Sequence, residues 1–403
     1  MILSKRSFFL ILLSVTAIYF GAMINYAYLP RYLLFLNTPD PLIQLTRSVF
    51  TSTFFIFPSI IGKLSDKIQN RYLFIVFGIM GNVICLLLLL FTNNLVLIII
   101  LLFIFGFFSS AFSILFTLYV EVVQNDPKKI SLYNACFAAG WFLGVQTGGI
   151  LINAFGIEYL FLYSLIPFII SFLSVIFIKE DRQLILEGTK QLNTSSQQSK
   201  YDDDFQDNNS GIKSIIYGLF FRSFGFRPIL GVVVIIMGFH LTNEIEIGFL
   251  IGINPLLQFF LMILVGKVIT NKNLKTITVW GYIMSIVVFI GYILSIDFWS
   301  FLSTQILLSL SYSLLWTGSV TYIAQISTPK NKGRYMGYVN TSAFAGDSLG
   351  GLFLSLLLLV FYNDYYLSMY FMIIFPIISL IIISLRFKPY HKTMQDSKKS
   401  LDS

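Results

Sequence analysis

Long unbroken runs of apolar residues limit most strongly what this chain can fold into. Runs such as Val83–Phe91 and Leu95–Phe108 contain no charged residue. Hydrophobic residues make up 56% of the 403 residues and charged residues 11%, whereas a soluble domain carries about 25% charged residues. So much apolar surface requires lipid as the solvent, where only helix bundles and closed barrels satisfy the backbone. Barrel strands alternate between apolar and polar residues, so we predict an all-α membrane protein.

Twelve segments are long enough to cross a bilayer, which takes about 20 apolar residues per helix. We place them at 8–30, 42–62, 72–91, 95–120, 130–153, 157–178, 228–243, 246–266, 275–295, 298–325, 333–360 and 366–386. The first follows Lys5 and Arg6 but runs too long for a signal peptide and lacks a small-residue cleavage site. We therefore expect it to be retained.

The longest polar stretch divides the chain into two sets of six helices. We expect an N-terminal bundle at 1–178, a central cytoplasmic loop at 179–227, a C-terminal bundle at 228–390 and a polar cytoplasmic tail at 391–403. The end of the loop, Ile212–Phe226, mixes apolar residues with Lys213 and Arg222, and Arg227 follows it. That composition fits a short helix on the membrane surface or an ordinary basic flank of the seventh helix.

The distribution of Lys and Arg predicts the orientation in the membrane. If the amino terminus is cytoplasmic, the loops 63–71, 121–129, 179–227, 267–274 and 326–332 are cytoplasmic too. With the adjoining helix ends and both termini, they hold 25 of the 27 Lys and Arg, all but Arg31 and Arg47. The net charge of +8 therefore reflects topology, not a nucleic-acid surface. We expect a multi-pass protein of the cell membrane, in contact with its lipid bilayer, monomeric and with both termini in the cytoplasm.

The stock of reactive side chains argues against an enzyme. Cys85 and Cys136 both lie in apolar runs, and the two histidines, His240 and His391, have different surroundings. They offer no disulfide framework, metal spacing or catalytic triad. No Gly-x4-Gly-Lys-Ser/Thr loop occurs, so direct use of ATP is not expected. We predict no cofactor and no metal.

The two halves are repeats. Residues 127–149 align without gaps with 329–351 at an offset of 202, with shared Pro, Lys, Tyr, Phe and Gly residues. The pair Gly62-Lys63 recurs as Gly266-Lys267 at an offset of 204, each followed by a basic loop and an apolar helix. Duplicated six-helix halves around a central cavity are a known transporter architecture, with the substrate held between the halves near mid-membrane.

A loop motif lies between the second and third helices. Gly62-Lys63-Leu64-Ser65-Asp66 and Arg71 resemble the loop signature of the major facilitator superfamily, although Gln69 and Asn70 depart from it. The resemblance implies twelve helices in two pseudo-symmetric bundles. It also implies that Gly62, Asp66 and Arg71, with Glu121 as an acidic partner, form a latch that holds the halves in the outward-open state. A solvated charged loop is the alternative reading.

The fifth helix carries a second pattern of small residues, Gly140, Gly144, Gly148 and Gly149, and the repeat places Gly346, Gly350 and Gly351 on the eleventh helix. Small residues every four positions let helices pack closely. The run also resembles the fifth-helix motif of family antiporters, but Val145 replaces their Pro, and the fourth helix contains no Arg. Direction of transport and subfamily therefore stay open.

Charged groups inside the membrane are costly and so mark candidate functional residues. Asp347 follows Arg334 by 13 residues, about 20 Å into the membrane. There it could carry a coupling proton, hold a cationic substrate group, or pair with a polar group of another helix. His240 is the second candidate for proton coupling, with a packing role as the alternative.

Two arginines break the charge pattern on the outer side. Arg47 could bind an anionic substrate, form a gate pair with Glu244 or Glu246, or extend to the outer headgroups. For Arg31, at the outer end of the first helix, extension to the headgroups is the favoured reading. Polar and aromatic residues of the first, fourth, seventh and tenth helices would face the cavity in the family layout. Together with Arg47, the candidates are Asn25, Tyr26, Asn243, Gln305, Tyr312 and Trp316.

The resemblance covers nearly the whole chain and implies secondary transport of a small organic solute by alternating access. Protons are the candidate coupling ion. A receptor or assembly protein that does not transport and a lipid-moving protein on the same fold are the alternatives.

Overall fold

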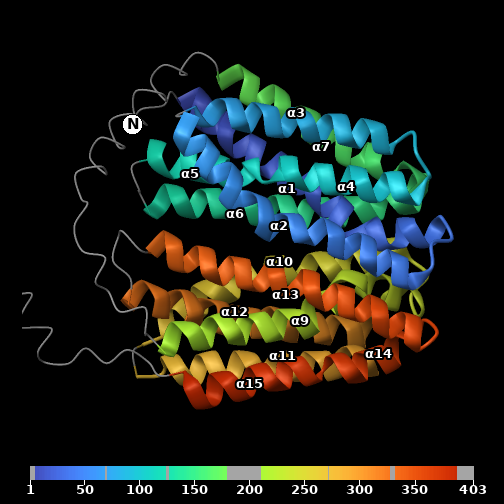
Figure 1. The fold of residues 1–403 in the computed structure, drawn as a ribbon, viewed down its shortest axis with the longest axis vertical. Helices are drawn as coiled ribbons and strands as arrows, with labels where there is room; N and C mark the ends of the chain where they lie inside the picture. The colour runs from blue at the N-terminus through green and yellow to red at the C-terminus, as the bar shows by residue number, and fades with distance from the viewer. Residues whose placement is uncertain are drawn as a thin grey trace, which may run out of the picture.

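The computed structural model describes residues 5–68, 70–123, 127–178, 210–270, 272–326 and 332–387. Its first half contains α1 (Lys5–Phe35), α2 (Asp40–Ile68), α3 (Arg71–Leu89), α4 (Leu95–Ser109), α5 (Ala111–Val122), α6 (Pro127–Phe155), η1 (Ile157–Tyr159) and α7 (Leu160–Ile176). The second half contains α9 (Ser210–Gly238), α10 (Glu244–Val268), α11 (Leu274–Leu294), α12 (Phe298–Ile326), α13 (Lys332–Val360), α14 (Tyr365–Met372) and α15 (Ile374–Arg386). Figure 1 shows the halves as two bundles of roughly parallel helices.

The prediction of twelve membrane-spanning helices is confirmed. The described residues form twelve helical spans of sufficient length and hydropathy, and no strand. Two spans are interrupted. The fourth consists of α4 and α5 and breaks at Ser110, whose hydroxyl donates to the Phe107 carbonyl at 2.6 Å. The twelfth consists of α14 and α15, and Pro376 just after the break cannot donate a backbone hydrogen bond.

The seventh span begins much earlier than the sequence suggested. We placed it at 228–243, but α9 runs unbroken from Ser210 to Gly238. Residues 212–226 are therefore neither a surface helix nor a loop flank. The basic residues of this segment led to the prediction of a loop flank. In the structure, Arg222 is 2% exposed and donates to Ser285 inside the bundle. The charge lowers the hydropathy of a segment that is nevertheless buried.

In both halves, a row of glycines on one helix lies directly against the backbone of another helix; we call such a row a glycine seam. On α6, a side chain at Gly140 or Gly144 would collide with the α1 backbone at Thr16 and Phe20. On α13, Gly346 and Gly350 meet the α9 backbone at Phe220 and Phe224 in the same manner. These close contacts are the geometry that the predicted packing role requires, and they repeat between the halves. Gly148 continues the first seam against Tyr28 of α1.

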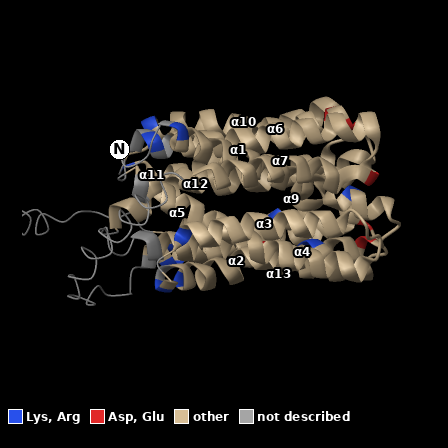
Figure 2. Ribbon diagram, turned by 90° about the horizontal axis from the view of Figure 1, so that it is seen from above, with Lys and Arg blue, Asp and Glu red and all other residues tan. Residues whose placement is uncertain are grey.

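Charge defines two ends of the molecule (Figure 2). We call the end where α2 finishes and α3 begins the basic end; it carries residues such as Lys63, Lys67 and Lys267. The opposite end, where α1 finishes and α2 begins, is the acidic end. It carries Asp40, Glu158, Glu244, Glu246, Asp297 and Asp364.

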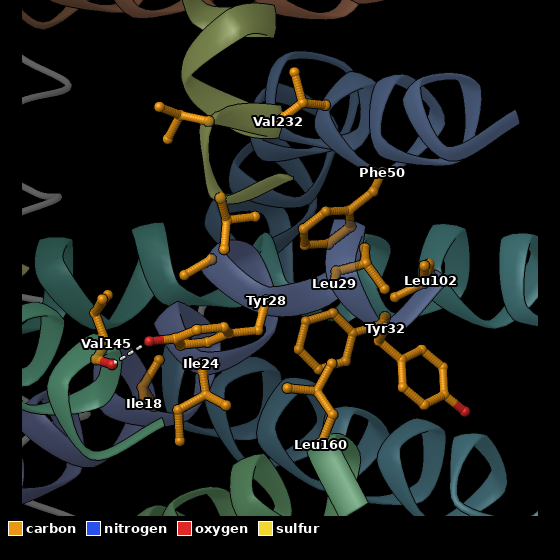
Figure 3. Packing of buried hydrophobic residues seen from close by; sticks show 14 of the residues in the cluster. Ile18, Ile24, Tyr28, Leu29, Tyr32, Phe50, Leu102, Val145, Leu160 and Val232 are labelled. Atoms are coloured by element: carbon orange, nitrogen blue, oxygen red, sulfur yellow. Dashed lines mark hydrogen bonds between the residues drawn. The ribbon is translucent and has the colours of Figure 1, made fainter. Parts of the chain in front are cut away.

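The buried core joins the halves toward the acidic end. One cluster contains residues of both halves, and Figure 3 shows Val232 of α9 above Leu29 and Phe50 of the first half. A second cluster contains only C-terminal residues, among them Ile215, Tyr322 and Phe387, which lie toward the basic end. The two halves therefore share a hydrophobic core toward the acidic end, whereas the C-terminal half has a core of its own toward the basic end.

Candidate functional site

Helices α2 and α6 of the first half pack against α13 and α10 of the second, and this interface is closed toward the acidic end. Gly149 lies against the Glu244 carbonyl and Gly248, and Gly351 against Ser48. Two hydroxyls also cross the interface. Ser348 donates to the Ser48 carbonyl at 3.0 Å, and Ser355 donates to the Pro41 carbonyl at 2.6 Å.

The same helices separate toward the basic end. A side chain at Gly62, Gly266 or Gly337 would meet no atom within 4 Å. A cavity of about 340 Å³ lies there between α2, α5 and α13. Its lining includes Phe54, Ser59, Thr117 and Asn340. The two halves thus touch at the acidic end and leave a cavity between them at the basic end.

A buried ion pair lies inside the closed part of the interface. Arg47 of α2 and Asp347 of α13 are 2% and 1% exposed, and the Nη1 and Oδ1 atoms are 3.7 Å apart. The Arg47 Nη2 donates to the Tyr26 hydroxyl at 2.7 Å, and the guanidinium lies 5.1 Å from the Tyr26 ring centre. Its guanidinium also fills the space beside Gly231, where any side chain would overlap it. The pair therefore connects α1, α2, α9 and α13.

This pair is only partly satisfied. The distance of 3.7 Å is too long for a hydrogen bond. Arg47 Nε and Nη1 and Asp347 Oδ1 are buried without a hydrogen-bond partner, and so is the amide of neighbouring Gln44. Burying two charges costs several kcal/mol unless the hydrogen bonds are complete.

A second ion pair crosses the interface nearer the surface. Arg31 of α1 and Glu244 of α10 are 2.6 Å apart, with side chains 22% and 14% exposed. A side chain at Gly238 would contact the Arg31 guanidinium, so the pair closes α1 against both α9 and α10. Water screens a pair at this exposure, which makes it weaker than its short distance suggests.

The gate partner predicted for Arg47 was wrong, and so was the favoured position of Arg31. We offered Glu244 or Glu246 as the gate partner of Arg47, but Asp347 is its partner and Glu244 pairs with Arg31. The favoured reading of Arg31, extension to the headgroups, is replaced by this ion pair. The position of α9 explains the difference, because its glycines let both arginines lie inward.

The histidine candidate lies at the surface. His240 follows the end of α9, is exposed, and its Nε2 lies 2.7 Å from the Tyr366 hydroxyl. Its predicted place inside the seventh helix was wrong, because α9 starts 18 residues before the predicted position and ends at Gly238.

The remaining cavity candidates have different roles. Asn25 accepts from Ser164 at 2.8 Å within the first half, and Asn243 caps α10 by accepting from the Ile245 N–H. Gln305 is buried beside Asn254, which donates to its carbonyl. Tyr312 and Trp316 are partly exposed and stack with ring centres 5.7 Å apart. Of the set, only Tyr26 joins the ion pair.

The latch residues are described in part. Gly62 and Arg71 line the cavity at the basic end. The side chains of Asp66 and Glu121 lie outside the described part of the structure, as do residues 179–209 and the tail with His391. The latch therefore stays a prediction.

The sequence missed two arginines on α9. Arg222 lies about 18 Å from the start of the helix and Arg227 about 26 Å, at 1.5 Å per residue. Both were counted as loop residues. Arg222 is buried, whereas Arg227 is partly exposed, with its guanidinium 5.0 Å from the Phe344 ring centre. The apolar residues between them, Ser223 aside, were the available signal for a helix.

Comparison with known proteins agrees with this architecture. The family model described as Major Facilitator Superfamily matches residues 10–206 and 215–401. No curated protein matches the chain.

Three solved structures share the fold at low sequence identity. An auto-inhibited POT family peptide transporter has a TM-score of 0.79 at 12% identity, over 96% of this chain and 98% of that chain. The nucleoside transporter NupG gives 0.72 at 11% identity, over 97% and 100%. The human organic anion transporter MFSD10 (TETRAN) gives 0.65 at 12% identity, over 94% and 99%. With the family model matched over both halves, the chain belongs to the major facilitator superfamily.

Proposed function

We propose that the protein is a secondary transporter that moves a small organic solute across the membrane by alternating access. The observation that carries the proposal is the contrast between the two ends of the interface between the halves. Two ion pairs and two hydrogen bonds cross it toward the acidic end, whereas a cavity separates the halves at the basic end. An interface that closes at one end while open at the other is what alternating access requires.

The clustering of basic residues supports a cytoplasmic position for the basic end. In that orientation the structure corresponds to a state open to the cytoplasm. The proposed latch of Gly62, Asp66, Arg71 and Glu121 then belongs to the opposite state, in which the basic end is closed. Asp66→Asn is expected to slow the transport cycle while leaving equilibrium substrate binding nearly unchanged.

Asp347 is our candidate for proton coupling. Protonation of its carboxyl group removes the charge that pairs with Arg47, so the closed acidic end loses its buried ion pair. A proton arriving from the acidic side would thereby favour opening on that side. This route couples one proton to one conformational change without any additional site.

The test is uptake by purified protein in liposomes, with a panel of small solutes and with or without an imposed pH gradient. We expect accumulation of at least one solute and a strong reduction without the gradient. Asp347→Asn should lose gradient-driven accumulation while retaining exchange of solute across the membrane. Accumulation that persists in Asp347→Asn would exclude this residue as the proton carrier, and absence of any uptake or exchange would contradict transport.

A further inference from the structure

The middle of α9 carries more positive charge than the described residues neutralise. Arg222 and Arg227 both lie in the central part of this membrane-spanning helix. Within the described residues, the two ion pairs that bridge the halves involve Arg31 and Arg47, and neither α9 arginine has a carboxylate partner. A charge at this depth normally finds an opposite charge, a polar partner or water.

Arg222 is held by neutral groups only. Its Nε donates to the Ser285 hydroxyl at 2.8 Å, and its guanidinium lies 4.8 Å and 5.8 Å from the ring centres of Phe226 and Tyr312. Its Nη2 is buried without an acceptor, and the nearby Tyr282 hydroxyl is buried without a partner. The positive charge is therefore fixed in place, and part of its donor capacity is unused.

A chain of aromatic contacts leads from the cavity at the basic end to Arg227. Its guanidinium lies over Phe344, which contacts Phe54 at a ring-centre distance of 5.5 Å, and Phe54 lines the cavity at the basic end. Arg227 is partly exposed and follows Arg222 by five residues, about 7.5 Å along the helix axis, so the two positive charges repel. An anion near Arg227 would relieve this repulsion as well as pair with the guanidinium.

An aromatic pair lies on the side of α9 that carries Arg222. Tyr312 and Trp316 of α12 are partly exposed and stacked, and Tyr312 extends toward Arg222 across the space between α12 and α9. The two helices make few backbone contacts with each other, because α12 packs mainly on α10 and α11 and α9 packs on α13 and α15. The contact between α9 and α12 is therefore made by side chains such as Arg222 and Tyr312.

We propose that Arg227, reinforced by the positive charge of Arg222, binds the carboxylate of an organic anion that enters from the cavity, with its apolar part against Phe344 and Phe54. Arg47 does not compete for this role in the present state because Asp347 neutralises it. The inference rests on the proposed transport function and specifies its substrate class. Arg–carboxylate pairing is planar and two-pronged, so Lys would replace Arg227 only in part.

The experiment measures equilibrium binding to the purified full-length protein in detergent, with three probes of similar size. Phenylacetate carries the carboxylate, phenylacetamide is its neutral counterpart, and phenethylamine is cationic. We expect phenylacetate to bind about tenfold or more tightly than the other two, as a charged hydrogen-bonded pair allows. Arg227→Gln should remove this preference, and Arg227→Lys should retain part of it.

Lys213→Gln is the matched control. Lys213 lies on the same helix, is exposed near the basic end, and loses the same charge on substitution. Its phenylacetate binding should equal that of the wild type. Equal binding of the three probes, no phenylacetate binding, or unchanged binding in Arg227→Gln would overturn the proposal.

Uptake of the same probes into liposomes separates this proposal from the proposed transport function. Phenylacetate binding without uptake would count against transport of this anion and leave the anion site standing. Uptake of the amide or the amine, without preference for phenylacetate, would support transport and refute the anion site.

Discussion

The two halves share one packing scheme but differ in the charges that it buries. Gly144 lies against the Phe20 backbone in the first half, as Gly350 lies against the Phe224 backbone in the second, so α1 and α9 correspond at an offset of 204. At this offset Ile18 and Met23 correspond to Arg222 and Arg227. On the partner helices, the contacts match Gly140 with Gly346, so Trp141 corresponds to Asp347.

This comparison distinguishes residues that hold the helices together from residues that are candidates for function. The glycine seams are kept in both halves because backbone contact leaves no room for a side chain there. The charges of Arg222, Arg227 and Asp347 have no charged counterpart in the first half, so packing does not require them at these positions. We infer that the C-terminal half carries the charge chemistry, while the first half contributes Arg47 and Tyr26 to the shared interface.

Breaking the buried pair should have the largest effect. Asp347→Asn leaves the Arg47 charge buried and unpaired, at an expected cost of about 3–5 kcal/mol to the closed acidic end. Thermal unfolding of the purified variant should show a clearly lower melting temperature. Combining Asp347→Leu with Arg47→Met removes both charges and should recover most of the loss.

Glu246→Gln is the control for this prediction, since Glu246 has no ion-pair partner among the described residues. Its melting temperature should match that of the wild type. If Asp347→Asn is as stable as this control, the pair does not hold the closed interface.

Substitution of two neighbouring glycines on α13 should distinguish the effect of packing within a half from the effect of packing between the halves. Gly350→Val collides with the Phe224 backbone of α9 inside the C-terminal half, so we expect a loss of about 1–3 kcal/mol or failure to fold. Gly351→Val instead meets Ser48 of α2 and should mainly oppose closure of the acidic end. Melting temperatures and yields of folded protein give the comparison.

Gly337→Val provides the reference on the same helix, because open space surrounds Gly337. It should be neutral in stability. Equal losses in all three variants would mean that the seams do not distinguish the two kinds of contact.

Arg31→Gln should have a smaller effect than any change at the buried pair. The Arg31–Glu244 pair is partly exposed, so its contribution is at most about 1 kcal/mol and should decline with added salt. Melting temperatures of the variant and the wild type, measured at low and high salt, should converge at high salt. A difference that is large and independent of salt would place this pair on a level with Arg47–Asp347.

His240→Gln should have the smallest effect. The ring is exposed beyond the end of α9 and contacts Tyr366 of the same half, so no interface between the halves depends on it. Uptake driven by a pH gradient should equal that of the wild type. A loss of coupling in this variant would move the proton site from the interface to the acidic-end surface.

The sequence predicted the scaffold well because apolar length and glycine spacing are local signals. It located Asp347 and Arg47 inside the membrane, since each charge interrupts an apolar run. It could not pair them, because pairing depends on how α2 and α13 meet across 300 positions of chain.

The seventh helix was the main failure, and its cause is physical. Arg222 and Arg227 reduce the apolar character of a segment that is buried by other helices, so hydropathy assigned them to a loop. A charge on a membrane helix and a charge on a basic flank look alike until the surrounding helices are known. The same error moved His240 from the surface into the membrane.

Distances between the halves at both ends test the central claim most directly. We would attach spin labels to cysteines on α6 and α10, after replacing Cys85 and Cys136 by alanine. The pair Phe155→Cys and Ile245→Cys reports on the acidic end, and Leu132→Cys with Lys267→Cys reports on the basic end. All four side chains are exposed.

Both ion pairs would then be broken by Asp347→Asn combined with Arg31→Gln. Pulsed electron spin resonance should show the acidic-end distance lengthening and the basic-end distance shortening, because the halves rock about a shared interface. Unchanged distances at both ends, or lengthening at both ends together, would contradict alternating access controlled by these pairs.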